Sequence, residues 1–82
     1  MKIVKVEWID SCADSNRWQL LEDFESSVVR PTTYGFLIYE DDEKITVAQT
    51  YAEGDENVPA QFNGAMTIPR CSITKISYIE GF

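Results

Sequence analysis

Residues 33–51 (TYGFLIYEDDEKITVAQTY) constrain the fold more than any other stretch of the sequence. Two runs rich in aromatic, β-branched and threonine side chains flank the acidic tetrapeptide 40–43 (EDDE). Such side chains suit a pleated, half-buried strand. In the second run Ile45 and Val47 fall on one face and Thr46 on the other, because side chains alternate along a strand. The stretch therefore predicts a β-hairpin with an acidic turn.

The chain on either side of this hairpin carries further strand patterns. The sequence predicts five strands, at residues 2–9, 34–39, 44–51, 60–68 and 72–79. Gly35 suits the sharp bend of a small barrel, and Gly64 predicts a bulge or bend. Residues 69–71 (PRC) predict a tight turn. Because these strands are short and the chain has 82 residues, we expect one domain, residues 1–82, that is mainly β and forms a small five-stranded barrel.

One short helix is predicted after the first strand, at residues 17–25 (RWQLLEDFE). Trp18, Leu21 and Phe24 recur every three residues and would form one apolar face. Asp14 or Ser15 would cap its N-terminus. Because so short a helix does not persist alone in water, we expect it to dock on the sheet. We expect both tryptophans, Trp8 and Trp18, to be packing residues.

Composition excludes several classes of function. The net charge is −7, which disfavours non-specific binding to nucleic acid or to an anionic membrane. The sequence has no histidine, which removes histidine-dependent triads and His-containing zinc sites. Cys12 and Cys71 leave one disulfide open, although two thiols in a reducing cytosol are the favoured reading. With no signal-peptide pattern and no long apolar segment, we expect a soluble cytoplasmic protein that is not an enzyme, with no cofactor, metal or membrane partner.

The hairpin and the last turn together resemble the two motifs of an Sm/LSm domain. Gly35, Leu37 and Asp41 stand at the spacings of the first motif, and residues 68–73 (IPRCSI) keep the apolar frame of the second. Arg70 stands where the second motif has a glycine. The resemblance covers residues 35–73 and implies an Sm/SH3-like barrel.

A broader resemblance is to a group of small uncharacterised proteins from tailed phages and marine metagenomes. It rests on residues 6–10 (VEWID), Trp18, 34–37 (YGFL), 47–49 (VAQ) and 68–73 (IPRCSI). Together the two resemblances imply a phage-encoded homo-oligomer that works in the infected bacterial cell. They further imply a ring of about five to seven subunits, closed by edge-to-edge strand contacts, which binds single-stranded RNA or DNA.

The resemblance assigns nucleic-acid binding to the loops at residues 40–44 and 69–72. The candidate residues are Arg70, Ser72, Lys44, Asp41 and Tyr39. The Arg70 guanidinium can clamp a phosphate or stack on a base; the alternative is a turn arginine paired with a nearby acid.

The acidic run 40–43 weighs against this site, because four carboxylates repel phosphate. A solubilising turn is favoured there over a cation site, since the spacing is not that of a calcium loop. The alternative function is therefore a phage accessory protein that binds a host protein or sequesters a small nucleotide signal.

Overall fold

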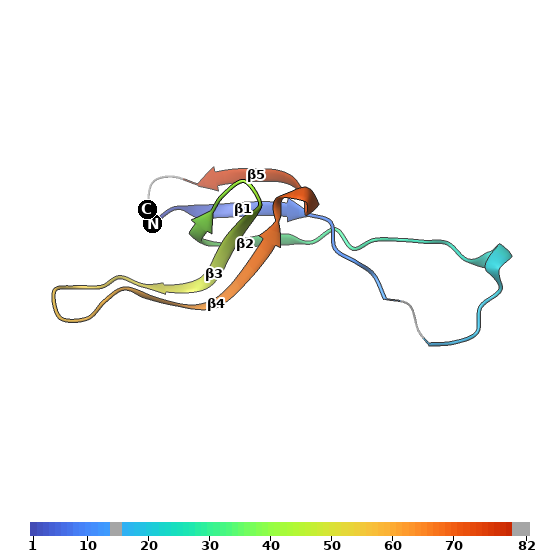
Figure 1. Cartoon of the computed structure of the whole chain (residues 1–82), viewed down its shortest axis with the longest axis horizontal. Helices are drawn as coiled ribbons and strands as arrows, with labels where there is room; N and C mark the ends of the chain where they lie inside the picture. The colour runs from blue at the N-terminus through green and yellow to red at the C-terminus, as the bar shows by residue number, and fades with distance from the viewer. Residues whose placement is uncertain (14–15, 80–82) are drawn as a thin grey trace.

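A computed structural model describes residues 1–13 and 16–79, and shows one antiparallel sheet (Figure 1). Its strands are β1 (Ile3–Trp8), β2 (Thr32–Glu40), β3 (Lys44–Ala52), β4 (Gln61–Pro69) and β5 (Ile73–Ile79). The strand order is β4-β3-β2-β1-β5, so that β4 and β5 are the two edges. Single 3-10 turns follow at η1 (Leu21–Asp23), between β1 and β2, and η2 (Arg70–Ser72), between β4 and β5. The expected mainly β fold with five strands is confirmed.

Two glycines let the strands bend and approach one another. A Cβ on Gly35 would lie 2.5 Å from the carbonyl oxygen of Ala48, so β2 approaches β3 too closely there for any side chain. The β2–β3 register also shifts between Leu37 and Tyr39. Gly64 in β4 has a φ of +69°, a left-handed conformation that favours glycine. Gly64 therefore occupies an irregular position of the kind that the sequence predicts, whereas Gly35 lies at a close approach of β2 to β3.

The core lies between β1 on one side and β3 and β4 on the other. The cluster of almost completely buried side chains comprises Val4, Val6, Ile45, Val47 and Ile68. The alternation predicted for the hairpin is confirmed by Ile45 and Val47. Trp8 packs against this cluster, and its indole N–H donates a hydrogen bond to the Thr33 hydroxyl (3.0 Å). Trp8 is thus the packing residue that the sequence predicts.

The predicted helix at residues 17–25 is wrong. Only η1 is helical there, and its two flanking residues, Leu20 and Phe24, are extended. Trp18 is fully exposed, so the prediction that it packs is wrong as well. The physical reason is that a nine-residue amphipathic segment needs a surface to dock on, and this segment lies away from the sheet (Figure 1). The predicted caps Asp14 and Ser15 lie outside the described residues.

The β1–β2 connection forms an arm, defined here as residues 9–13 and 16–31. Its base continues the ladder of the two strands: Asp10 and Val29 exchange backbone hydrogen bonds of 2.8 and 3.2 Å, and the Trp8 N–H donates to the Pro31 carbonyl (3.2 Å). The arm and the β3–β4 hairpin project in opposite directions, and the longest dimension is 62 Å (Figure 1). The radius of gyration is 17.4 Å, against about 12 Å for a compact chain of this length.

Candidate functional site

The β2–β3 turn is organised by the carboxylate of Asp41. Its Oδ1 accepts the backbone N–H groups of Glu43 (2.8 Å) and Lys44 (2.9 Å), the usual use of aspartate in a tight turn. Its Oδ2 accepts the Tyr39 hydroxyl (2.9 Å) and pairs with the Lys44 ammonium (3.0 Å). The Glu43 N–H, followed by Lys44 and Tyr39, holds the pKa of Asp41 well below its usual value. Asp41 is therefore a turn-forming carboxylate whose acceptor sites are occupied.

The hydrogen bonds and negative charge of Asp41 also change the pKa values of two neighbouring side chains, Tyr39 and Lys44. They raise the pKa of the Tyr39 hydroxyl above its ordinary value, and they raise the pKa of Lys44 in the same way. The Lys44 ammonium also lies over the Tyr39 ring, 5.6 Å from its centroid. The three side chains form one cluster with a lysine that stays charged.

Arg70 extends from η2 to the same turn. Its Nε donates to the Asp41 carbonyl (2.9 Å), and its Nη2 pairs with the Glu40 carboxylate (3.1 Å). The Arg70 backbone N–H donates to the Glu43 carbonyl (2.7 Å). The Tyr78 hydroxyl of β5 donates to the same Glu40 oxygen (3.0 Å). Arg70 thus connects η2, which joins the two edge strands β4 and β5, to the β2–β3 turn.

The structure brings together four of the five residues predicted from the sequence: Arg70, Lys44, Asp41 and Tyr39. The fifth, Ser72, ends η2, where its carbonyl accepts the Ile9 N–H (2.8 Å) and connects the turn to β1. The sequence prediction missed Glu40 as a direct partner and missed Tyr78. Glu40 belonged to the acidic run, but the pairing of Tyr78 with it depends on strand order and leaves no local signal.

The electrostatics of this turn oppose a polyanion. Residues 40–43 place four carboxylates in this turn, and each of the cations Arg70 and Lys44 is paired with one of them. A phosphate would have to displace Glu40 or Asp41 to reach either cation. The alternative reading of Arg70, a turn arginine paired with an acid, matches this geometry.

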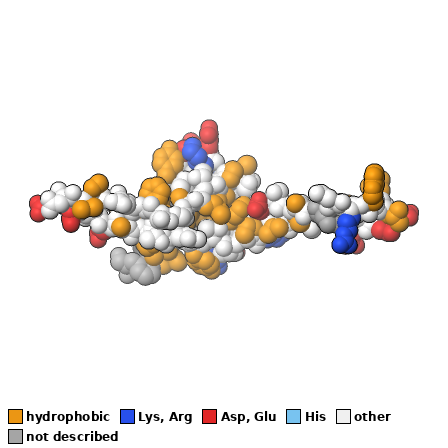
Figure 2. Space-filling model, turned by 90° about the horizontal axis from the view of Figure 1, so that it is seen from below, with side chains coloured by type: hydrophobic (Ala, Val, Ile, Leu, Met, Phe, Trp, Pro, Cys, Tyr) orange, Lys and Arg blue, Asp and Glu red, His pale blue; other side chains and the backbone are white. Residues whose placement is uncertain are grey.

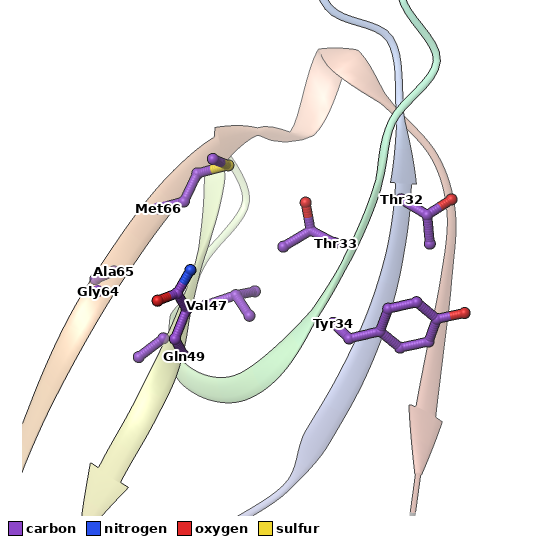
Figure 3. Close-up of a pocket in the computed structure, with 9 residues that line it drawn as sticks. Thr32, Thr33, Tyr34, Val47, Gln49, Gly64, Ala65 and Met66 are labelled. Carbon is purple, nitrogen blue, oxygen red and sulfur yellow. The ribbon is translucent and has the colours of Figure 1, made fainter.

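A separate hollow of about 500 Å³ lies between the start of β2 and the middle of β3 and β4 (Figure 3). Thr33 and Val47 face it from β2 and β3, and Met66 stands at its rim on β4. Gly64 and Ala65, which have no side chain and a small one, form part of its wall. None of the described residues that line this hollow is charged, which suits a neutral, mostly apolar occupant.

Other site chemistries find little support in the part of the chain that is described. Cys12 and Cys71 are exposed free thiols. Residues 1–13 and 16–79 contain no group of three His, Cys, Asp or Glu side chains placed to hold a metal ion. In the same residues, no helix has the length and apolar character needed to cross a bilayer.

Comparison of the chain with protein-family models, with curated proteins and with solved structures found no match.

Proposed function

We propose that this chain is a non-catalytic binding protein that acts as a homo-oligomer and recognises protein surfaces. The observation that carries the proposal is the excess of exposed apolar side chains. Among the described residues fourteen large hydrophobic side chains are exposed, whereas six hydrophobic residues are buried. Exposed apolar surface on this scale marks a contact site with another protein.

The total surface supports the same conclusion. The accessible area is 6692 Å², whereas a folded monomer of this mass exposes about 5,000 Å². The excess is larger than the roughly 800 Å² that one partner buries at a standard interface. A chain of 9.4 kDa has a small core, so covering this surface in an oligomer would add stability that the core of one copy does not provide.

The sheet edges offer the means of assembly. β4 is nine residues long (QFNGAMTIP) and carries no charged side chain. Natural edge strands are usually protected by charges, and a long uncharged edge pairs with another strand. The other edge, β5, is free for the same contact at the opposite side of the sheet. Pairing of β4 with β5 of the next copy is heterologous, and a closed ring would satisfy every edge.

A barrel-like curl of the sheet fits this scheme. Val4 of β1 packs in one cluster with Ile45 of β3 and Ile68 of β4, although β2 separates β1 from β3 in the sheet. A single flat sheet with no covering helix would leave these side chains in water. The burial supports an Sm/SH3-like barrel, which we propose as the protomer of a ring of about five to seven subunits.

Two matched substitutions test the assembly. Phe62→Lys places a charge on the β4 edge, and Val58→Lys places the same charge in the β3–β4 loop. The two side chains are 53% and 51% exposed, so neither change disturbs the core. We expect Phe62→Lys to lower the native mass measured by light scattering, and Val58→Lys to leave it unchanged. Equal masses for the two variants would refute edge pairing through β4.

Single-stranded RNA or DNA is the second candidate ligand. What favours it is the convergence of Arg70, Lys44 and Tyr39 on one turn, because cations beside an aromatic ring suit a phosphate and a base. Titration with single-stranded RNA at low and high salt separates the candidates. We expect no salt-sensitive binding. Binding that weakens steeply with salt and is lost in Arg70→Ala would replace the protein-binding proposal with this one.

A further inference from the structure

The arm is the most apolar exposed segment of the molecule. Six of the fourteen exposed large hydrophobic side chains belong to it: Trp18, Leu20, Leu21, Phe24, Val28 and Val29. Trp18 is fully exposed and Leu21 is 90% exposed. Apolar side chains gather at the end of the arm farthest from the sheet (Figure 2). A tryptophan and a leucine held in water have no role within a single copy.

The direction of the arm is fixed by its base. The Asp10–Val29 hydrogen bonds and the bond from Trp8 to Pro31 extend the β1–β2 ladder beyond the sheet. The arm therefore leaves the sheet along the strand direction, and its far end lies away from the sheet (Figure 1). This geometry favours a contact with another molecule over a contact within the chain.

The same chain supplies a surface that matches the arm. Among the described residues, none of those that line the hollow between β2, β3 and β4 is charged, and residues 18–21 (WQLL) carry no charge. Since each copy has a net charge of −7, contacts between copies are favoured where both surfaces are neutral. The hollow has a volume of about 500 Å³, within the roughly 300–1,000 Å³ of pockets that enclose drug-sized ligands.

We propose that the arm of one copy docks on a second copy, with Trp18 seated in the hollow bounded by Thr33, Val47 and Met66. This inference rests on the proposed homo-oligomer and names a contact in it besides the sheet edges. In a ring of heterologous contacts the arm of each copy docks on the next copy, so every hollow is filled by a neighbour's arm.

The area is sufficient for a specific contact. The two aromatic side chains of the arm, Trp18 and Phe24, contribute roughly 300–500 Å² when both are buried. With the leucines and the walls of the hollow added, the total reaches the ~1,200 Å² of the smallest stable interfaces.

The test observes Trp18 directly. In a Trp8→Phe background Trp18 is the only indole, and its emission maximum and its quenching by acrylamide report exposure. We expect the assembled protein to show blue-shifted emission and at least a several-fold lower quenching constant than the same chain unfolded in urea. Gln49→Phe, which adds a ring to the hollow from an exposed position on the same face of β3 as Val47, is expected to return Trp18 to water (Figure 3). Ala60→Phe adds the same ring outside the hollow and is expected to leave Trp18 protected.

Three results would overturn the inference. The first is an assembled protein in which Trp18 is as accessible as in urea; the homo-oligomer would then stand without docking of the arm. The second is protection that persists in Gln49→Phe, which would place Trp18 on another surface. The third is protection in a 9.4 kDa monomer, which would mean that the arm folds back on its own chain and that the proposed homo-oligomer fails too. The measurement without the Gln49 substitution decides the first and third even if Gln49→Phe does not fold.

Discussion

At the scale of single residues, the turns of this protein repeat one device. Asp41 accepts the N–H groups of residues 43 and 44, and Asp55 accepts those of Asn57 (2.7 Å) and Val58 (2.8 Å) in the next hairpin loop. These bonds hold the pKa of both carboxyl groups below their ordinary values. Part of the acidic charge that looks like a ligand site in the sequence is therefore used to form turns.

Asp41→Asn tests this role through its pH dependence. The folded pKa of Asp41 lies below the ordinary aspartate value of 3.8. The ionised carboxylate therefore stabilises the fold above about pH 4, and this stabilisation is lost as pH falls through the folded pKa. We expect Asp41→Asn to lower the thermal midpoint at pH 7, with a gap to the natural chain that narrows below pH 4. Asp42→Asn, one residue along, removes the same charge without these hydrogen bonds and serves as the control.

Trp8 gives a second prediction at this scale. Its ring packs on the core and its N–H donates to Thr33. Trp8→Phe keeps most of the packing and removes the hydrogen bond, so we expect a loss of about 1 kcal/mol in the free energy of unfolding. Urea unfolding measures it, and a Thr33→Val variant should show no additional loss when combined with Trp8→Phe.

At the scale of elements, alternation and turn residues were sufficient to predict the five strands. The strand positions follow from local patterns such as Ile45 and Val47 on one face, and from the glycine and proline positions between them. The helix prediction was wrong because apolar spacing identifies a face that would need to be buried, but does not show whether the fold supplies a surface to bury it. Trp18 and Leu21 have such a face, and against the described part of the chain both side chains stay exposed.

The candidate site was predictable only in part for a related reason. Its loops could be inferred from the Sm/LSm resemblance, and they do meet at Arg70. The pairing of Arg70 with Glu40, and of Glu40 with Tyr78, joins residues that are 30 and 38 positions apart. Such contacts depend on the strand order, which alternation does not specify.

Gly35 tests the packing of β2 against β3. A Cβ there would meet the Ala48 carbonyl at 2.5 Å and the Val47 side chain at 2.6 Å. Because one contact is with backbone, the strands must separate, and we expect Gly35→Ala to cost about 1–3 kcal/mol. Denaturant unfolding measures the loss. A variant as stable as the natural chain would show that β2 and β3 are less closely packed than described.

At the scale of the whole molecule, exposed surface is what the long shape, the uncharged β4 edge and the exposed arm have in common. This surface is costly for a free monomer, and covering it becomes favourable once copies contact one another. The acidic surface fits this arrangement, since it keeps an assembly soluble while neutral surfaces make the contacts. The cations that might have attracted nucleic acid are instead paired within the turn.

The native mass of the unmodified chain decides whether copies of this chain cover one another's exposed surfaces. Light scattering across a hundred-fold range of concentration would compare it with the 9.4 kDa subunit. We expect a single species of several subunits that persists on dilution. A mass of 9.4 kDa throughout the range would mean that the exposed edge and arm are not covered by copies of this chain, and the homo-oligomeric function would be wrong.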